Sequence, residues 1–374
     1  MIKRSSFFIL AGAGSGDVLA AELILALRDR FPQISGSGVC GPAMRRTGIQ
    51  EIAPIESMAA LMTDKSPHLS REFETTLIET IARMQPNVAV LVGYSPFHQR
   101  LGEAFRLRGI PVVLYGAPNL AALGARELER LKDRVTKVLG IFPTEQLVLG
   151  RTGLDYQFVG SPHKDRASKV MVSPETLGFP PDETIIALLP GSRPEDFLEI
   201  APVMIQVQDI LRTALKGVRF VMPLSDNIPA SYAARVQVAG IQIVQGMSLE
   251  IMSLARVALT SFGTTSLECA LLGTPHVSIA TRRKGILARQ QGQFSGSVNQ
   301  AARTKVVAEF LTADDPFAIA DAVQILMNDD DQRHIMRQAF QRLKDDLKGL
   351  AAENASAIIG HYLAPRRSVR RPAV

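Results

Sequence analysis

The sequence predicts an α/β protein built from two doubly wound domains. Short apolar runs rich in β-branched residues alternate with helical patterns, and unbroken apolar strands between helices are typical of parallel sheets covered on both faces. The alternation lapses between Val159 and Thr184, in a stretch rich in Pro, Ser and charge, which indicates a domain boundary. We therefore expect an N-terminal domain at residues 1–165, a C-terminal domain at 166–363 and a basic tail at 364–374.

The expected strands are short runs, each followed by a turn and a helical pattern. In such sheets, ligands bind beyond the carboxyl ends of the strands, so the residues just after each run are the candidates for a site. The runs are Phe7–Leu10, Val88–Val92, Val112–Tyr115 and Val138–Phe142 in the first domain, and Ile185–Leu189, Arg219–Leu224, Ile241–Val244, Val257–Thr260 and His276–Ile279 in the second.

Composition indicates a globular chain of 374 residues, with 46% hydrophobic and 21% charged residues. No apolar run approaches the roughly 18 residues of a membrane span. The start, with Lys3, Arg4 and the short run Phe7–Leu10, has too little apolar sequence for a signal peptide. Cys40 and Cys269 form no CxxC pair, so neither a disulfide framework nor a zinc site is expected. We expect a cytoplasmic protein.

The formal net charge of +6 favours an anionic partner. Nucleic acid is a poor candidate, because the chain has no Trp, few aromatic residues and no basic helix with interleaved aromatics. A phosphorylated ligand or a lipid surface remains.

The first turn, GAGSGD at residues 12–17, joins a buried strand to a helix. Gly12, Gly14 and Gly16 would let the backbone approach a ligand closely, and Asp17 would lie at or next to the helix start. Gly14, Ser15 and Gly16 are therefore candidates for substrate binding. The alternative is a tight structural turn in which Asp17 is an ordinary helix-terminal acid.

A second turn, PGSR, precedes a helix that carries acidic residues in its first turns. Gly191 and Ser192 offer backbone and hydroxyl donors, and Arg193 carries a guanidinium fork that matches phosphate oxygens. A cation at a helix start opposes the helix dipole unless an anion binds there, so a surface arginine without a ligand is the less attractive interpretation.

A third turn, FGTTSLE, also leads from a strand into a helix. Thr264 and Thr265 can bind phosphate at the helix start, and Glu268 can accept hydrogen bonds from ribose hydroxyls. The alternative is a capping box in which a threonine caps the helix and Glu268 reaches back to it. Two such turns in one domain predict a site for a nucleoside diphosphate.

Taken in order, these motifs resemble the lipid-A-disaccharide synthase family over nearly the whole chain. The motifs are GAGSGD, GPAM (41–44), YGAPN (115–119), FPTE (142–145), VGSPHKD (159–165), LLPGSR (188–193) and GTTSLECALLGTP (263–275).

The resemblance implies an inverting glycosyltransferase with two Rossmann-like domains of the GT-B type, facing each other across a cleft. The implied reaction joins a UDP-diacylglucosamine donor to an acylated glucosamine phosphate acceptor at the cytoplasmic face of the inner membrane. UDP would be held by the C-terminal domain through Gly191, Ser192, Arg193, Thr264, Thr265 and Glu268. No cofactor and no metal are expected, because helix dipoles and cations can neutralise the leaving diphosphate.

The departures from the family pattern lie mostly on the acceptor side. Ala13 and Gly14 stand where the family has Glu and Thr, and Ser161 stands where it has His. The segment that is rich in Trp in the family contains no Trp in this chain. Tyr94 takes the place of a catalytic Asp. Because a tyrosine with a pKa of about 10 is a poor base near neutral pH, His98 and Asp17 are the other catalytic candidates.

Histidines 98 and 163 each have a plainer interpretation. His98 could be a solvated residue at a helix start, and His163 an ordinary linker residue rather than one that faces the cleft.

Two basic segments, 281–289 and 364–374, have the composition of segments attracted to anionic lipid. The alternatives for these are a solvated face and a disordered tail.

Two rival functions remain open at this point, and so does the existence of a homo-oligomer. The first rival is a catalytically silent relative that binds a UDP-sugar, which Ala13, Tyr94 and Ser161 favour. The second is a UDP-sugar epimerase of the same fold, which only the shared donor domain favours.

Overall fold

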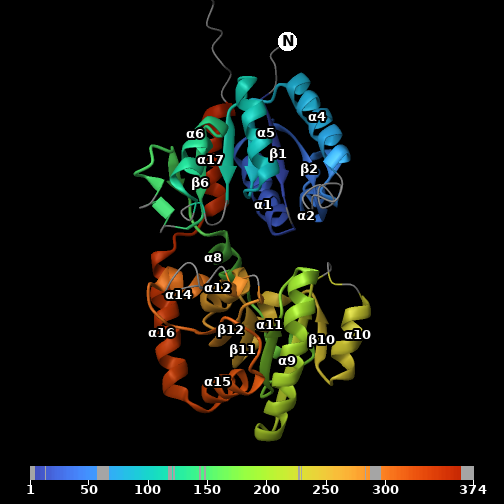
Figure 1. Ribbon diagram of the computed structural model, residues 1–374, viewed down its shortest axis with the longest axis vertical. Helices are drawn as coiled ribbons and strands as arrows, with labels where there is room; N and C mark the ends of the chain where they lie inside the picture. The colour runs from blue at the N-terminus through green and yellow to red at the C-terminus, as the bar shows by residue number, and fades with distance from the viewer. Residues whose placement is uncertain are drawn as a thin grey trace, which may run out of the picture. The chain divides into compact units, whose positions relative to one another are not determined.

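A computed structural model describes residues 5–12, 14–56, 67–116, 120, 123–142, 145–146, 149–225, 228, 230–282, 284–286 and 296–363. The chain forms two compact units. Unit 1 consists of Met1–Pro162 together with Lys348–Val374, and unit 2 consists of His163–Leu347. Each unit has its own parallel sheet covered by helices (Figure 1).

The sheet of unit 1 has seven strands in the order β3-β2-β1-β4-β5-β6-β7, and every pair of neighbours is parallel. The strands are β1 (Ser6–Ala11), β2 (Ser35–Cys40), β3 (Gln50–Pro54), β4 (Val88–Val92), β5 (Val112–Tyr115), β6 (Lys137–Gly140) and β7 (Tyr156–Phe158).

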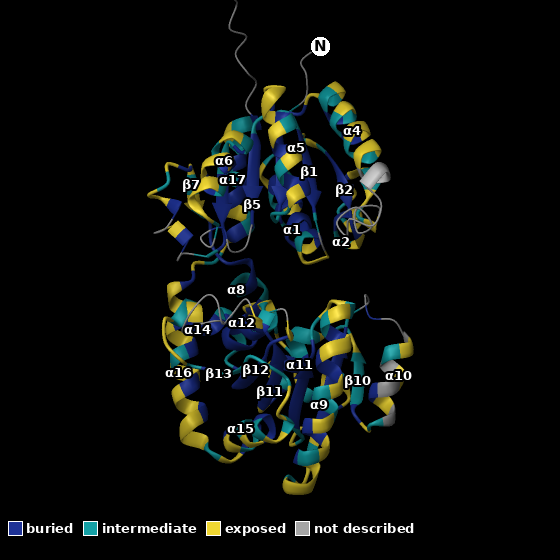
Figure 2. Ribbon diagram, in the orientation of Figure 1, coloured by how far each residue is buried: buried dark blue, intermediate teal, exposed yellow. Residues whose placement is uncertain are grey.

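Helices cover both faces of this sheet. Phe7 and Ile9 of β1 pack against α1 and α17 on one face, whereas Phe8 and Leu10 pack against α4, α5 and α6 on the other. The central strands β1, β4 and β5 are therefore buried along almost their whole length, whereas the edge strands β3 and β7 are partly exposed (Figure 2), as expected for a parallel sheet covered on both faces. The helices of unit 1 are α1 (Gly14–Arg30), α2 (Pro42–Arg46), α4 (Pro67–Met84), α5 (Pro96–Leu107), α6 (Ala125–Arg134) and α17 (Ala351–Leu363).

The sheet of unit 2 has six strands in the order β10-β9-β8-β11-β12-β13, again all parallel. The strands are β8 (Thr184–Leu189), β9 (Val218–Leu224), β10 (Gln242–Gln245), β11 (Val257–Ser261), β12 (His276–Ile279) and β13 (Ala308–Phe310). The helices are α8 (Pro162–Ala167), α9 (Pro194–Ala214), α10 (Ala230–Val238), α11 (Ser248–Leu254), α12 (Thr264–Leu272), α14 (Ser297–Ala302), α15 (Pro316–Asn328) and α16 (Asp330–Asp346), with a short 3₁₀ turn η2 (Pro174–Leu177).

The predicted fold class is confirmed, since two parallel sheets carry helices on their faces. Every predicted strand is present within a few residues, but β2, β3, β7 and β13 were not predicted. The sequence of β2 is SGSGVC, which has weak strand propensity. Its glycines are required by packing: a Cβ at Gly36 would lie 2.4 Å from Phe7 Cζ, and one at Gly38 would lie 2.6 Å from the Ile9 carbonyl oxygen.

The predicted extent of the C-terminal domain needs a correction. The division at Pro162 falls inside the Pro-rich stretch, but α17, expected in the C-terminal domain, belongs to unit 1. Its residues Ala355 and Ile359 pack into the core around α1, and a Cβ at Gly360 would lie 2.4 Å from Phe31 Cζ. An amphipathic pattern alone cannot tell which sheet a terminal helix covers. The predicted tail at 364–374 lies outside the described residues.

Candidate functional site

The two predicted phosphate turns of unit 2 lie side by side. The chain runs from β8 outward through β9 and β10 and then returns to the other side of β8 with β11, so β8 and β11 are neighbours, with Leu189 beside Thr260. A reversal of this kind opens a crevice at the carboxyl ends of the strands, where doubly wound sheets bind ligands. Both turns begin there.

Gly191 sits where the two turns meet. Its φ of +112° is strained for any residue with a side chain, and a Cβ would lie 3.1 Å from Ser261 Oγ. Ser192 and Arg193 are exposed, and Arg193 is the N-cap residue of α9. Within the described residues the Arg193 guanidinium forms no hydrogen bond or ion pair. Its charge at a helix start is therefore available to an anion.

Lys284 connects the two turns. Its Nζ donates to Asp196 Oδ2 at 2.8 Å and to the Phe262 carbonyl oxygen at 2.9 Å. A second contact joins the same two segments, because the Arg282 backbone N–H donates to the Glu199 carboxylate. Part of the basic segment 281–289 thus has a structural role, whereas Arg283 and residues 287–289 lie outside the described part. Sequence analysis missed Lys284, because its partners are far away along the chain.

The third turn starts α12 with Gly263 as its N-cap, at a φ of +135°. Thr264 is exposed and Thr265 half-buried. The capping-box alternative is wrong, because no side chain caps the helix and Glu268 is bound elsewhere. The first backbone N–H groups of α12 therefore have no side-chain acceptor at the cap, the arrangement that suits phosphate.

Glu268 is bound on one side only. Its Oε1 lies 3.0 Å from His163 Nδ1 and 3.4 Å from an Arg166 guanidinium nitrogen, and Oε2 has no hydrogen bond within the described residues. Burial acts to raise the pKa of Glu268, but His163 and Arg166 together outweigh it and lower the pKa. The carboxylate is thus held ionised with one oxygen unused, as a ribose-binding group requires.

Beneath α12 lies a buried polar network. His276 Nε2 lies 2.8 Å from Ser266 Oγ, and its Nδ1 lies 3.0 Å from the Thr274 carbonyl oxygen. Nδ1 therefore carries the proton and Nε2 accepts from Ser266. Burial lowers the pKa of His276 to about 4. The network fixes α12 on β12 and leaves its N-terminal residues exposed.

In unit 1 the same reversal occurs between β1 and β4. Gly14 and Ser15 are exposed at the start of α1. A Cβ at Gly16 would lie 3.6 Å from the Val92 carbonyl oxygen, an ordinary contact. The predicted substrate-binding residues of unit 1 thus lie at the carboxyl edge of the sheet, next to the end of β4.

Asp17 is almost fully buried, with 2% of its surface exposed. Its carboxylate accepts three backbone N–H groups, those of Gly41 at 3.0 Å, Ala43 at 2.7 Å and Met44 at 3.1 Å. These bonds cap α2 and hold it against α1. These are the contacts of an acid that holds two helices together. The catalytic role of Asp17 stays a prediction.

Tyr94 and His98 follow β4. The Tyr94 hydroxyl donates to Glu127 Oε1 at 3.2 Å, and burial together with the Glu127 charge raises the pKa of Tyr94 to about 12. His98 is 2% exposed, so the solvated-histidine interpretation is wrong. Its Nδ1 lies 2.7 Å from Oγ of Ser95, the N-cap of α5, and burial lowers the pKa of His98 to about 4.

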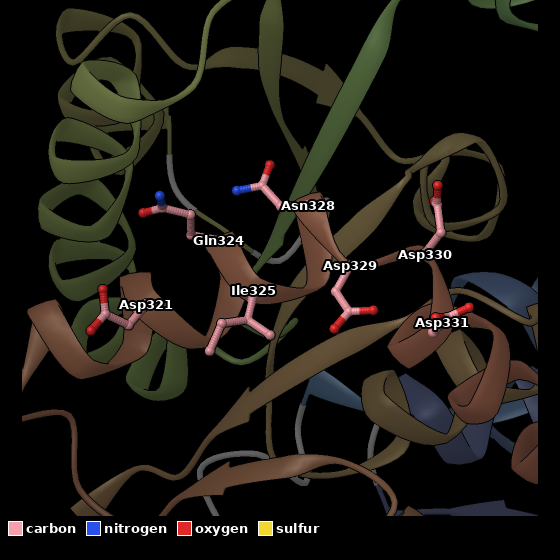
Figure 3. A pocket seen from close by; sticks show the side chains of 7 residues that line it. All are labelled: Asp321, Gln324, Ile325, Asn328, Asp329, Asp330 and Asp331. Carbon is pink, nitrogen blue, oxygen red and sulfur yellow. The ribbon is translucent and has the colours of Figure 1, made fainter.

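A shallow hollow of about 810 Å³ lies on another part of unit 2, lined by Asp321, Gln324, Ile325, Asn328, Asp329, Asp330 and Asp331 (Figure 3). It is formed by α15 and α16 and contains none of the predicted site residues. Asp329 caps α16 there, and Asp330 pairs with Arg333 and Arg256. Among the described residues, no group of His, Cys, Asp and Glu side chains could hold a metal ion.

Comparison with known proteins decides the family. The profile of a family described as lipid-A-disaccharide synthetase matches residues 7–360. The chain belongs to the lipid-A-disaccharide synthase family. This confirms the resemblance seen in the motifs and makes the chain a glycosyltransferase by family.

Individual family members are similar over nearly their whole length. Lipid-A-disaccharide synthase 1 of Legionella pneumophila subsp. pneumophila is 30% identical over 370 residues, covering 94% of this chain and 96% of the relative. The synthase of Syntrophus aciditrophicus is 28% identical over 367 residues, with the same coverage.

Solved structures show the same fold at low identity. The S. aureus MnaA structure with UDP has a TM-score of 0.66 at 14% identity, covering 96% of this chain and 97% of that one. A UDP-GlcNAc 2-epimerase from Neisseria meningitidis bound to UDP-GlcNAc has a TM-score of 0.63 at 14% identity, covering 96% and 99%. A Rickettsia africae glycosyltransferase has a TM-score of 0.59 at 13% identity, covering 96% and 98%.

Proposed function

We propose that the protein joins UDP-2,3-diacylglucosamine to 2,3-diacylglucosamine 1-phosphate and releases UDP and lipid A disaccharide 1-phosphate. The observation that carries the proposal is the pair of phosphate turns after β8 and β11, in a chain of this family. Two proteins of the same fold are named with UDP or UDP-GlcNAc bound, which supports a UDP-sugar donor.

The donor would bind to unit 2. Ser192, Arg193 and the first N–H groups of α12 offer hydrogen bonds and positive charge to the diphosphate, and Thr264 and Thr265 add hydroxyls. Oε2 of Glu268 would accept from the ribose. When the acceptor hydroxyl attacks the anomeric carbon, the bond to the diphosphate breaks and negative charge grows on the leaving group. Arg193 and the helix start stabilise that charge without a metal.

The acceptor would bind to unit 1, at Gly14, Ser15 and Gly16. Of the three catalytic candidates, His98 has a ring that is neutral near pH 7 and could accept a proton, but burial lowers its pKa to about 4 and so makes it a weak base. Tyr94 keeps its proton at that pH. Asp17 would act by fixing the turn, since its oxygens already accept from α2.

A silent relative that only binds UDP-sugar is the second candidate function. Tyr94 favours it, because a half-buried phenol bonded to Glu127 stands where the family has a catalytic carboxylate. The epimerase alternative draws on the fold alone.

The acceptor is a lipid, so we also propose that the protein works in the cytoplasm, peripherally at the inner face of the inner membrane. None of the described helices is long and apolar enough to cross a bilayer. The net charge of +6 and the basic residues of 364–374 favour an anionic membrane surface. Binding to anionic vesicles that neither salt nor removal of residues 364–374 reduces would refute the electrostatic part. The proposal leaves open whether the protein forms a homo-oligomer.

The reaction is tested by incubating the purified protein with both substrates and identifying the products by mass spectrometry. The proposal predicts the disaccharide monophosphate. Tight UDP binding without that product would favour the silent relative.

A further inference from the structure

Glu145 is a buried acid at the carboxyl edge of the unit 1 sheet that the proposed reaction does not use. It follows β6, and only 4% of its surface is exposed. Its Oε1 accepts the backbone N–H of Leu120, which follows β5, at 3.2 Å. Its Oε2 lies 3.3 Å from the hydroxyl of Tyr156, the first residue of β7. Glu145 thus links the chain that follows β5 and β6 to the first residue of the neighbouring strand β7.

The protons in this group can be counted. The Tyr156 hydroxyl lies 2.9 Å from the Phe142 carbonyl oxygen as well as 3.3 Å from Glu145 Oε2. A carbonyl only accepts, and a phenol has one proton to donate. If Tyr156 donates over the shorter distance, to Phe142, then the contact with Glu145 needs a second proton, and only the carboxyl group can carry it.

Charge leads to the same conclusion. Within the described residues no cation contacts Glu145, and its named neighbours are the Tyr156 hydroxyl and the Leu120 N–H. An ionised carboxylate buried without a cation is costly. Burial raises the pKa of Glu145 to about 7, against the opposing effect of its two hydrogen bonds. The site is closely built: a Cβ at Gly140 would lie 1.7 Å from Tyr156 Oη, so only glycine lets the ring cross β6.

We infer that Glu145 is a positioning residue that works as a neutral acid, donating a proton to Tyr156 Oη and accepting from Leu120 N–H, and so anchors the chain after β5. Because β5 neighbours β4, this anchor sets the edge of the sheet next to Tyr94 and His98. The effect of this anchor on acceptor binding rests on the proposed function, whereas the protonation state of Glu145 does not.

The test compares wild type with Glu145→Gln, whose amide is neutral and can make both hydrogen bonds. Infrared difference spectra at about pH 6, where ordinary carboxylates are ionised, should show the C=O band of one protonated acid in wild type that Glu145→Gln lacks. The band should fade as the pH rises through about 7. Glu79→Gln, on the exposed side of α4, is the matched control and should keep the band.

Identical spectra for wild type and Glu145→Gln at that pH would overturn the inference. If Glu145→Gln does not fold, Tyr156→Phe decides: removal of the accepting hydroxyl should move the band of a neutral Glu145 to higher frequency, and an unchanged carboxyl region would overturn the inference.

Stability and activity give independent signs. A raised folded pKa means that stability is fully present below the unfolded pKa and is lost as the pH rises through about 7. The unfolding midpoint of wild type should therefore fall relative to Glu145→Gln over this window. Sugar transfer should fall over the same window in wild type and not in Glu145→Gln. If no variant transfers sugar, the proposed function fails while the spectra still decide the inference.

Discussion

Nδ1 of His163 lies 3.0 Å from Oε1 of Glu268, although the two residues are 105 positions apart. Arg166 adds a guanidinium nitrogen at 3.4 Å from the same oxygen. Both partners come from α8, and Glu268 comes from α12. The pair fixes the carboxylate one turn into α12, the helix that begins with Thr264 and Thr265, and leaves Oε2 without a hydrogen bond among the described residues.

His163→Ala should make nucleotide binding more sensitive to acid. The lowered pKa of Glu268 means that its stabilising charge is present above the ordinary carboxyl range and is lost as the pH falls through the folded pKa. Without His163 that pKa rises, so UDP affinity should be lost at a higher pH than in wild type. Calorimetric titration with UDP between about pH 4 and 7 measures this. Coincident profiles would mean that Glu268 does not bind the nucleotide.

Arg193→Ala should weaken UDP binding by roughly 1.5–3 kcal/mol, the range for a hydrogen bond to a charged group. The side chain is exposed, so the melting temperature should not change. Arg342→Ala, which removes another exposed arginine of unit 2 on α16, is the control and should bind UDP normally. An unchanged affinity in Arg193→Ala would remove this residue from the site.

Asp17→Asn should destabilise unit 1 by about 3 kcal/mol, since an amide replaces a buried charge that accepts three backbone N–H groups. UDP affinity, which we place in unit 2, should be unchanged. Asp29→Asn is the matched control, because Asp29 is exposed on the same helix. Urea denaturation and transfer rate should be measured on both variants. A stable Asp17→Asn protein with strongly reduced turnover would instead favour a catalytic role.

His98 should make unit 1 sensitive to acid. Its pKa is lowered to about 4 by burial, so the folded state binds fewer protons than the unfolded state between about pH 4 and 6.5. Stability is therefore fully present above this window and lost as the pH falls through it, by up to about 3 kcal/mol. His98→Gln should remove this part of the acid dependence in urea denaturation. His276 has a similar effect in unit 2 and serves as the internal comparison.

Local sequence predicted much of the fold and part of the site. The buried strands and the turns at Gly191 and Gly263 were recognisable, because apolar runs followed by glycine and hydroxyl residues are local signals. Strand β2 was not recognisable, because its glycines are required by close contact with Phe7 and Ile9 of the neighbouring strand. The contact of Glu268 with His163 and the hydrogen bond of Lys284 with Asp196 join residues that are far apart in the sequence. The same is true of the backbone N–H groups that bind Asp17. No pattern within one segment encodes such contacts.

Sugar transfer by this chain is tested by the stoichiometry of UDP release against disaccharide formation, measured with and without acceptor. We expect UDP to appear only when the monophosphate acceptor is present, with one UDP per disaccharide, and Arg193→Ala to lower both products equally. UDP release without acceptor, or UDP binding with neither product, would show that the chain does not carry out this transfer.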